Sequence, residues 1–138
     1  NLAGNVKQEV RYPQEWMNTE EFMPMVQLIG EMVKNYISIP PASETISPEY
    51  VGKMVIESMW SVSQYAGDFN PFHIHEGQLS GVCYLRVPPS LPKVGDIFLF
   101  PNWLAHGVYP FRTPNEERRS VSFNLHLIKK DEPQPLDN

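Results

Sequence analysis

The sequence predicts a mainly β fold, a sandwich or barrel with one helix packed against its outside. Fourteen of the 138 residues are proline, roughly twice the usual share. Proline disfavours long helices because it lacks a backbone N–H donor. From residue 54 onward, short apolar segments are separated by proline and glycine turns, which is the pattern of β-sandwiches and barrels.

Length and composition favour a single domain, which we assign to residues 1–128. Hydrophobic residues make up 41% of the chain, enough to form a core. Residues 129–138 are charged and contain two prolines. We therefore expect them to form a flexible C-terminal tail.

Charge and cysteine content exclude several classes of protein. The net charge of -5 provides no basic surface for nucleic acid or for an anionic membrane. Cys83 is the one cysteine, so no intrachain disulfide framework exists. No apolar run is long enough to cross a bilayer, and the N-terminus lacks a signal pattern. We expect a cytoplasmic protein without nucleic-acid or membrane partners, whose oligomeric state is not predicted.

The N-terminal part predicts an extended arm and then a helix. Residues 1–16 fit an edge strand or an arm. Residues 24–37 carry apolar side chains at the i, i+3, i+4 and i+7 spacing of an amphipathic helix. Pro24 fits the first turn of this helix, and the Ile39-Pro40-Pro41 segment ends it. A loop rich in proline and serine is expected from there to Pro48.

The remainder of the chain predicts strands. Residues 54–65 alternate, with Met54, Ile56, Trp60 and Val62 on one face of a long strand. Turns follow at Gly67-Asp68 and Asn70-Pro71. Shorter strands are predicted at residues 73–75, 79–87, 96–100, 106–109 and 118–128.

Three of the four histidines are candidate metal ligands. On a strand, His73 and His75 would point to the same face, and His106 from a distant strand would complete a facial set. Histidine binds Fe, Zn, Cu and Ni, so the spacing indicates a metal site without identifying the metal. Glu76 is an alternative third ligand. The competing interpretation is that these histidines are hydrogen-bonded side chains of the surface or core.

A second candidate site is the strand at residues 118–124. Its even positions place Arg118, Ser120, Ser122 and Asn124 on one face. If that face lines a barrel, the guanidinium needs an anionic partner, because an unpaired buried charge is costly. A small-molecule carboxylate would supply it, with additional hydrogen bonds from Ser120 and from the phenol of Tyr84. The alternative is an edge strand with a solvated polar face.

These segments occur in a characteristic order: Gly-Asp-Phe-Asn-Pro-Phe-His-Ile-His, a Ser-Gly-Val-Cys-Tyr-Leu strand, Phe-Pro-Asn-Trp-Leu-Ala-His-Gly-Val, and Arg-Arg-Ser-Val-Ser-Phe-Asn. The order resembles the Fe(II)- and 2-oxoglutarate-dependent oxygenases, in particular small prolyl-hydroxylase-like members found in bacteria and marine phages. The resemblance covers about half of the chain, from Trp60 to Asn124. It implies a double-stranded β-helix, the jelly-roll or cupin-like barrel.

The resemblance also implies roles for individual residues. His73 and His106 would bind the metal, and Arg118 would bind the far carboxylate of 2-oxoglutarate with help from Ser120 and Tyr84. In most of the wider superfamily the third metal ligand is an aspartate or glutamate at the position of His75. The implied metal site of this chain therefore consists of three histidines, His73, His75 and His106. The implied cofactors are Fe(II), 2-oxoglutarate and O₂, with ascorbate a possible addition.

The implied activity is hydroxylation coupled to oxidative decarboxylation of 2-oxoglutarate. The substrate would be a small molecule or a protein side chain. Two alternatives remain open at this stage. One is a cupin-like metal-binding module without catalysis, and the other is a three-histidine dioxygenase that does not use 2-oxoglutarate.

Overall fold

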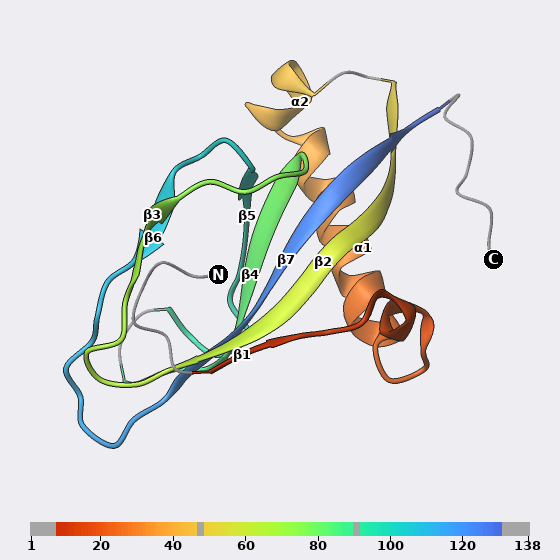
Figure 1. The fold of residues 1–138 in the computed structure, drawn as a ribbon. Coiled ribbons are helices and arrows are strands. Elements are labelled where there is room, and N and C mark those ends of the chain that lie inside the picture. Colours follow the sequence, from red (N-terminus) through yellow and green to blue (C-terminus); the bar gives the residue numbers. More distant parts are fainter. Residues whose placement is uncertain (1–7, 47–48, 90–91, 131–138) are drawn as a thin grey trace.

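The structure of the chain is a computed structural model that describes residues 8–46, 49–89 and 92–130. Its main element is a five-stranded antiparallel sheet in the order β1-β2-β7-β4-β5. One face of this sheet packs against helix α1, and a two-stranded sheet of β3 and β6 lies over the other (Figure 1). The strands are β1 (Gln8–Arg11), β2 (Tyr50–Gln64), β3 (Asn70–His73), β4 (Leu79–Arg86), β5 (Ile97–Pro101), β6 (His106–Val108) and β7 (Arg118–Lys129).

The mainly β prediction is therefore confirmed, and most strands lie close to their predicted positions. The exception is β3, which covers Asn70–His73, so the predicted turn at Asn70-Pro71 and the predicted strand at residues 73–75 were wrong. Within the predicted N-terminal arm, residues 8–11 form β1, which pairs with β2 at the sheet edge. Residues 14–16 belong to a 3-10 helix, so the prediction was wrong there, and residues 1–7 lie outside the described residues. Strand β7 includes Lys129, so the predicted tail begins at least one residue too early. From residue 131 onward, that tail lies outside the described residues.

Helix α1 (Met23–Ser38) confirms the helix predicted at residues 24–37. Pro24 lies in its first turn, and Ile29 and Val33 are its buried side chains. Two short helices were not predicted, η1 (Gln14–Asn18) and α2 (Ala42–Thr45). The prediction of a loop up to Pro48 was therefore wrong at α2. Pro41 precedes this helix in a helical conformation, and proline is well tolerated where no N–H partner is lost.

A β-bulge in β2 corrects the predicted strand faces. Ile56 pairs with Leu125, but Ser58 already pairs with Asn124, so β2 has one additional residue at this point. A bulge reverses the side to which the following residues point. Ile56 and Met59 consequently face the α1 core, whereas Trp60 lines the opposite face of the sheet.

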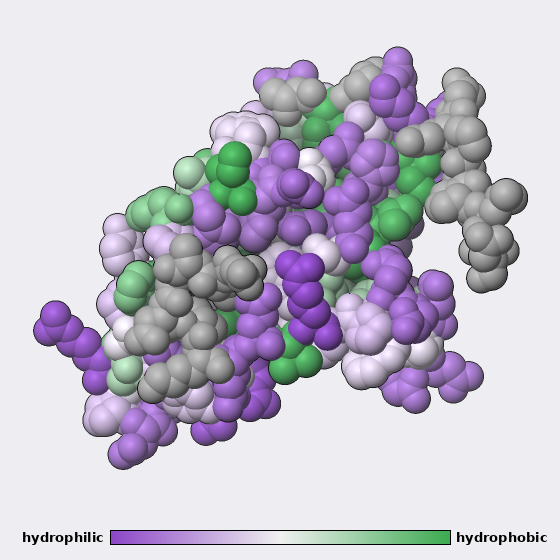
Figure 2. Space-filling model, viewed as in Figure 1, coloured by the Kyte–Doolittle hydropathy of each residue, from purple (hydrophilic) through white to green (hydrophobic). Residues whose placement is uncertain are grey.

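The hydrophobic core lies between α1 and the large sheet, where Phe123 and Leu125 of β7 are almost completely buried. No helix in the described part of the chain is long and apolar enough to span a membrane. Among the coloured residues of the face shown in Figure 2, hydrophilic side chains predominate and hydrophobic residues form small scattered patches.

Gly81 makes room for the Phe123 ring, and this predicts opposite effects for two alanine substitutions. A Cβ at position 81 would lie 2.3 Å from the Phe123 ring, so Gly81→Ala should destabilise the fold by about 1–3 kcal/mol. At Gly30 in α1, the nearest atom would lie at an ordinary 3.6 Å, so Gly30→Ala should stabilise by up to about 1 kcal/mol. Urea unfolding measures both, and equal effects of the two substitutions would contradict this packing.

Candidate metal centre

A cavity of about 570 Å³ separates the two sheets. Its floor is the face of the large sheet opposite α1, where cross-strand partners form four rows. Row one consists of Ser58, Asn124, Ser80 and Phe100, and row two of Trp60, Ser122, Val82 and Phe98. Row three consists of Val62, Ser120 and Tyr84, and row four of Gln64 and Arg118. Successive rows are about 7 Å apart, because they are separated by two residues along each strand.

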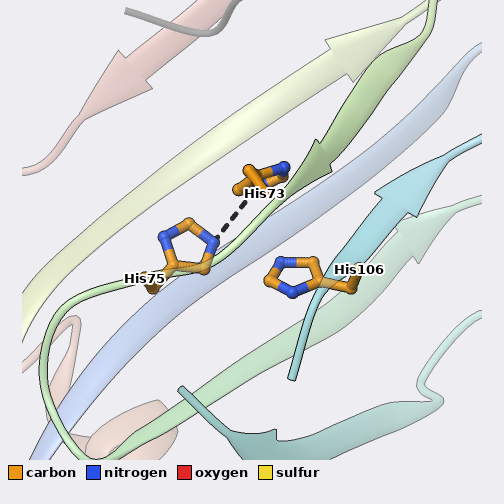
Figure 3. A group of neighbouring side chains, drawn as sticks. All are labelled: His73, His75 and His106. Carbon is orange, nitrogen blue, oxygen red and sulfur yellow. Dashed lines mark hydrogen bonds between the residues drawn. The ribbon is translucent and has the colours of Figure 1, made fainter. Parts of the chain in front are cut away.

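The predicted histidines converge above rows one and two. His73 of β3 pairs with His106 of β6, and His75 follows in the loop after β3. One ring nitrogen from each lies within 4.8 Å of the others. His75 contacts Trp60 in row two, and His106 contacts Phe100 in row one. Figure 3 shows the three rings directed toward one another.

The His73 and His75 side chains meet as predicted, but the predicted strand does not extend to His75. Strand β3 ends at His73, so His75 does not occupy the i+2 position of a continuous strand. His75 lies in the segment after β3, before a bend at residues 76–78, and the Nε2 atoms of His73 and His75 are 3.1 Å apart. Glu76, the alternative ligand, is exposed and does not belong to the group.

Backbone carbonyls fix two of the imidazoles in the form that metal binding requires. The Nδ1 atom of His73 lies 2.7 Å from the Pro71 carbonyl oxygen, and that of His106 lies 2.9 Å from the Leu104 carbonyl oxygen. A carbonyl only accepts, so each Nδ1 carries the proton. In the neutral ring, the lone pair is then on Nε2, where a metal ion would bind.

The protonation equilibria also favour neutral ligands. Burial, with the neighbouring charges of His73 and His106, lowers the pKa of His75 from 6.5 to about 4. Burial also lowers the pKa of His106, with a smaller contribution from His73 and against the opposing hydrogen bond to Leu104. A metal ion therefore displaces few protons from these two rings near neutral pH.

The low pKa of His75 predicts a stability profile for the metal-free protein. Since the folded state binds this proton only near pH 4 and the unfolded state binds it near 6.5, the unfolded state holds more protons between these values. Stability should fall as pH decreases from about 6.5 toward 4. Urea midpoints across this range measure the slope, which should be smaller in His75→Gln. An unchanged slope in that variant would contradict the assignment.

Asn102 holds the loop that carries His75. The His75 N–H donates to the Asn102 carbonyl (3.2 Å), and the Asn102 side-chain amide donates to the His75 carbonyl (3.3 Å). The Asn102 N–H also donates to the Gln78 carbonyl. These bonds tie the His75 loop to the segment that leads into β6.

Removing the Asn102 side chain should loosen His75 without unfolding the protein. Asn102→Ala should weaken Co(II) binding about tenfold, the lower end of the effect of losing an outer hydrogen-bond partner. A Co(II) titration followed by absorbance measures it, with exposed Asn35→Ala in α1 as the control. Unchanged affinity would show that the loop needs no such support.

Arg118 lies in row four beside Gln64, which lines the cavity, whereas Arg118 itself does not. Its Nε donates to the Gln64 side-chain oxygen and its NH2 to the Tyr109 carbonyl, both at 3.1 Å. Its guanidinium lies 5.2 Å from the Phe111 ring centroid. No Asp or Glu of the described residues forms an ion pair with it. Burial lowers the Arg118 pKa, and the nearby Tyr84 opposes this shift.

The remaining residues considered in the sequence lie partly in the cavity and partly outside it. Ser120 and Tyr84 line the cavity in row three, and burial raises the pKa of the Tyr84 phenol. Trp60 is buried and also lines the cavity, whereas Trp103 is 70% exposed and does not. Cys83 is a buried free thiol, as expected for a small apolar core residue.

Sequence reasoning missed Gln64 and Asn102, which orient Arg118 and the His75 loop. Gln64 had a usable signal, because it is a polar residue on the same strand face as Trp60 and Val62. Asn102 had none, since its contact with His75 joins residues 27 positions apart through a loop.

Comparisons with known proteins give a partial family match and a distant structural match. Residues 89–124 match the profile of a family described as "Putative 2OG-Fe(II) oxygenase". The matched segment contains His106 and the row residues Arg118, Ser120, Ser122 and Asn124. None of the curated proteins compared with the chain matches it.

One solved structure that matches is an oxidoreductase of the 2OG-Fe(II) oxygenase family from Burkholderia pseudomallei. It has 14% sequence identity and a TM-score of 0.49, and the match covers 70% of this chain and 56% of that chain. The chain thus spans little more than half of that protein. The predicted similarity to the 2OG-Fe(II) oxygenases is confirmed by the family match, which rests on the segment that holds His106 and Arg118.

Proposed function

We propose that this protein is an Fe(II)- and 2-oxoglutarate-dependent oxygenase that hydroxylates its substrate. The observation that carries the proposal is the pairing of two features in one fold. Three histidine nitrogens within 4.8 Å of one another lie in the cavity. The face of the large sheet opposite them carries Arg118, which has no carboxylate partner among the described residues.

The donor set fits a divalent transition metal. Three imidazoles suit Fe(II), although they suit Zn(II) and Cu(II) as well. Two of them are fixed by backbone carbonyls with Nε2 directed inward. When bound, Fe(II) would supply the redox chemistry that couples 2-oxoglutarate decarboxylation and O₂ reduction to oxidation of a substrate.

Arg118 is placed to bind the far carboxylate of 2-oxoglutarate. Gln64 and the Tyr109 carbonyl use Nε and one NH2 proton, which leaves both NH1 protons and one NH2 proton for a ligand. These remaining donors form a fork that matches a carboxylate. Tyr84 and Ser120 in row three are the nearest additional donors along the cavity floor.

The spacing of the rows suits a short dicarboxylate. Trp60, beside His75, and Gln64, beside Arg118, are four residues apart on β2, a backbone distance of about 13 Å. The imidazole and guanidinium side chains cover part of this distance. Trp60, Phe98 and Phe100 line the same cavity and would limit the access of water to the reacting groups.

We also propose that the fold is a reduced double-stranded β-helix. The chain passes from the large sheet (β2) to the small sheet (β3), back to the large sheet (β4, β5), again to the small sheet (β6), and returns in β7. This alternation is that of a jelly roll, which has eight strands in its complete form.

One observation favours a second candidate. The metal-binding group contains no carboxylate, so a three-histidine dioxygenase that does not use 2-oxoglutarate would have the same ligands. In that case Arg118 would bind a carboxylate of the substrate itself.

A thermal-shift experiment separates these proposals. With redox-inactive Mn(II) bound, 2-oxoglutarate should raise the melting temperature, because a ligand that binds only the folded state stabilises it. Glutarate, which lacks the keto group that would chelate the metal, should raise it much less. Equal shifts with both compounds, or no shift in protein shown to bind Mn(II), would contradict the proposed cosubstrate.

A further inference from the structure

Row one forms a polar cluster beneath the metal centre, at the end of the cavity floor away from Arg118. Ser58, Asn124 and Ser80 are adjacent cross-strand partners on β2, β7 and β4. Phe100 completes the row, and its ring lies 4.6 Å from that of His106. Three polar side chains on a sheet face that is covered by a second sheet need a reason to be there, because an apolar row would bury at lower cost.

Hydrogen bonds fix the Asn124 amide in one orientation. The Ser80 hydroxyl donates to the Asn124 side-chain oxygen (2.9 Å), and the Asn124 amide nitrogen donates to the Ser58 hydroxyl oxygen (3.2 Å). Ser80 is only 2% exposed. An asparagine side chain has two N–H donors and two oxygen lone pairs. Asn124 therefore retains one donor and one acceptor for a ligand in the cavity that it lines.

Rows one and two contain no ionisable side chain. The metal ion proposed above these rows would already be paired with the near carboxylate of 2-oxoglutarate. A second ionised group at Asn124 would then lose hydration without an opposite side-chain charge beside it. A neutral group that both donates and accepts hydrogen bonds would pair with the remaining donor and acceptor of Asn124. The neighbouring side chains Trp60 and Phe98 supply apolar surface for the rest of such a ligand.

We propose that row one is the substrate subsite and that it binds an uncharged amide, with Asn124 as the specificity-determining residue. This inference rests on the proposed function, since 2-oxoglutarate would occupy the floor from the metal centre to Arg118. The substrate then approaches the metal centre from the Asn124 side. Its amide exchanges hydrogen bonds with Asn124, and its apolar part lies against Trp60.

Binding of two small probes tests the subsite without knowledge of the natural substrate. Propionamide and propionate have the same carbon skeleton and differ in charge. Each is titrated into Zn(II)-loaded protein with 2-oxoglutarate present, and ¹H–¹⁵N spectra are recorded. Propionamide should shift the Asn124 side-chain signals, and propionate should bind at least about fivefold more weakly. Asn124→Leu should weaken propionamide binding by about five- to tenfold, the effect of losing one or two hydrogen bonds.

Two further variants keep the test decisive. Asn124→Asp preserves shape and can accept from both serine hydroxyls but lacks the free N–H, so it should also weaken propionamide binding. Asn35→Leu, at an exposed position of α1, should leave it unchanged. Equal binding of the two probes, no binding of propionamide, or undiminished binding by both Asn124 variants would overturn the proposal.

The same spectra distinguish failure of this inference from failure of the proposed function. The shifts caused by 2-oxoglutarate alone report on the proposed cosubstrate. If these shifts are present and propionamide does not bind, the subsite is wrong and the cosubstrate stands. If Asn124→Leu weakens 2-oxoglutarate and leaves propionamide unaffected, Asn124 serves the cosubstrate and the subsite proposal is overturned.

Discussion

Arg118→Ala should weaken 2-oxoglutarate binding by about 100-fold, because it removes a charged, forked donor from the far carboxylate. Arg118→Lys retains the charge but loses the fork and the bond from Nε to Gln64, so a loss of about tenfold is expected. Titration of Mn(II)-loaded protein with 2-oxoglutarate measures both affinities.

The neighbouring Arg119 provides a matched control. It points to the other face of β7 and forms an ion pair with the buried carboxylate of Glu117 at 2.8 Å. Burial of Glu117 would raise its pKa, but hydrogen bonds from Ser63 and Arg119 and the charges of Arg119 and Arg86 lower it overall. Arg119→Ala should leave 2-oxoglutarate affinity unchanged. A similar loss in both alanine variants would show a general effect of positive charge and remove the specific role of Arg118.

His106→Ala should reduce metal affinity by more than about 100-fold, beyond the effect of losing an outer hydrogen-bond partner. His106 supplies the ligand from β6, whereas the other two come from β3 and the loop after it. Its loss leaves only two of the three ligands, both from β3 and the segment that follows it. Competition with a chromophoric chelator measures the affinity for Co(II) and Zn(II).

Two variants at other histidines complete this test. His75→Asp replaces an imidazole with a carboxylate, which also binds divalent metals, and should retain metal binding. His126→Ala, in β7 and outside the three-histidine group, should leave metal affinity unchanged. Metal binding that survives His106→Ala would contradict the three-histidine centre.

The sequence was informative wherever function depends on strand alternation. The even positions from Arg118 to Asn124 were predicted to share a face, and they form part of the four rows. Alternation failed at the bulge between Ile56 and Ser58, since one inserted residue leaves no mark in the hydrophobic pattern. It was therefore wrong to place Ile56 and Trp60 on one face.

The candidate site was predicted as a set of residues, but its geometry was not. His75 reaches His73 from a loop, and that loop is held by Asn102, which lies far along the chain. Local spacing contains no information about such a contact. The role of Gln64 likewise depends on the register between β2 and β7, which pairs it with Arg118.

The most direct test of the central claim is an anaerobic titration of the Fe(II)-loaded protein with 2-oxoglutarate, followed in the visible spectrum. Chelation of the iron by the keto acid should produce a weak metal-to-ligand charge-transfer band. The band should be absent at the same concentrations in His75→Ala and Arg118→Ala. No band in folded, iron-loaded protein would contradict the use of 2-oxoglutarate and would leave a metal-binding module or a dioxygenase that acts without this cosubstrate.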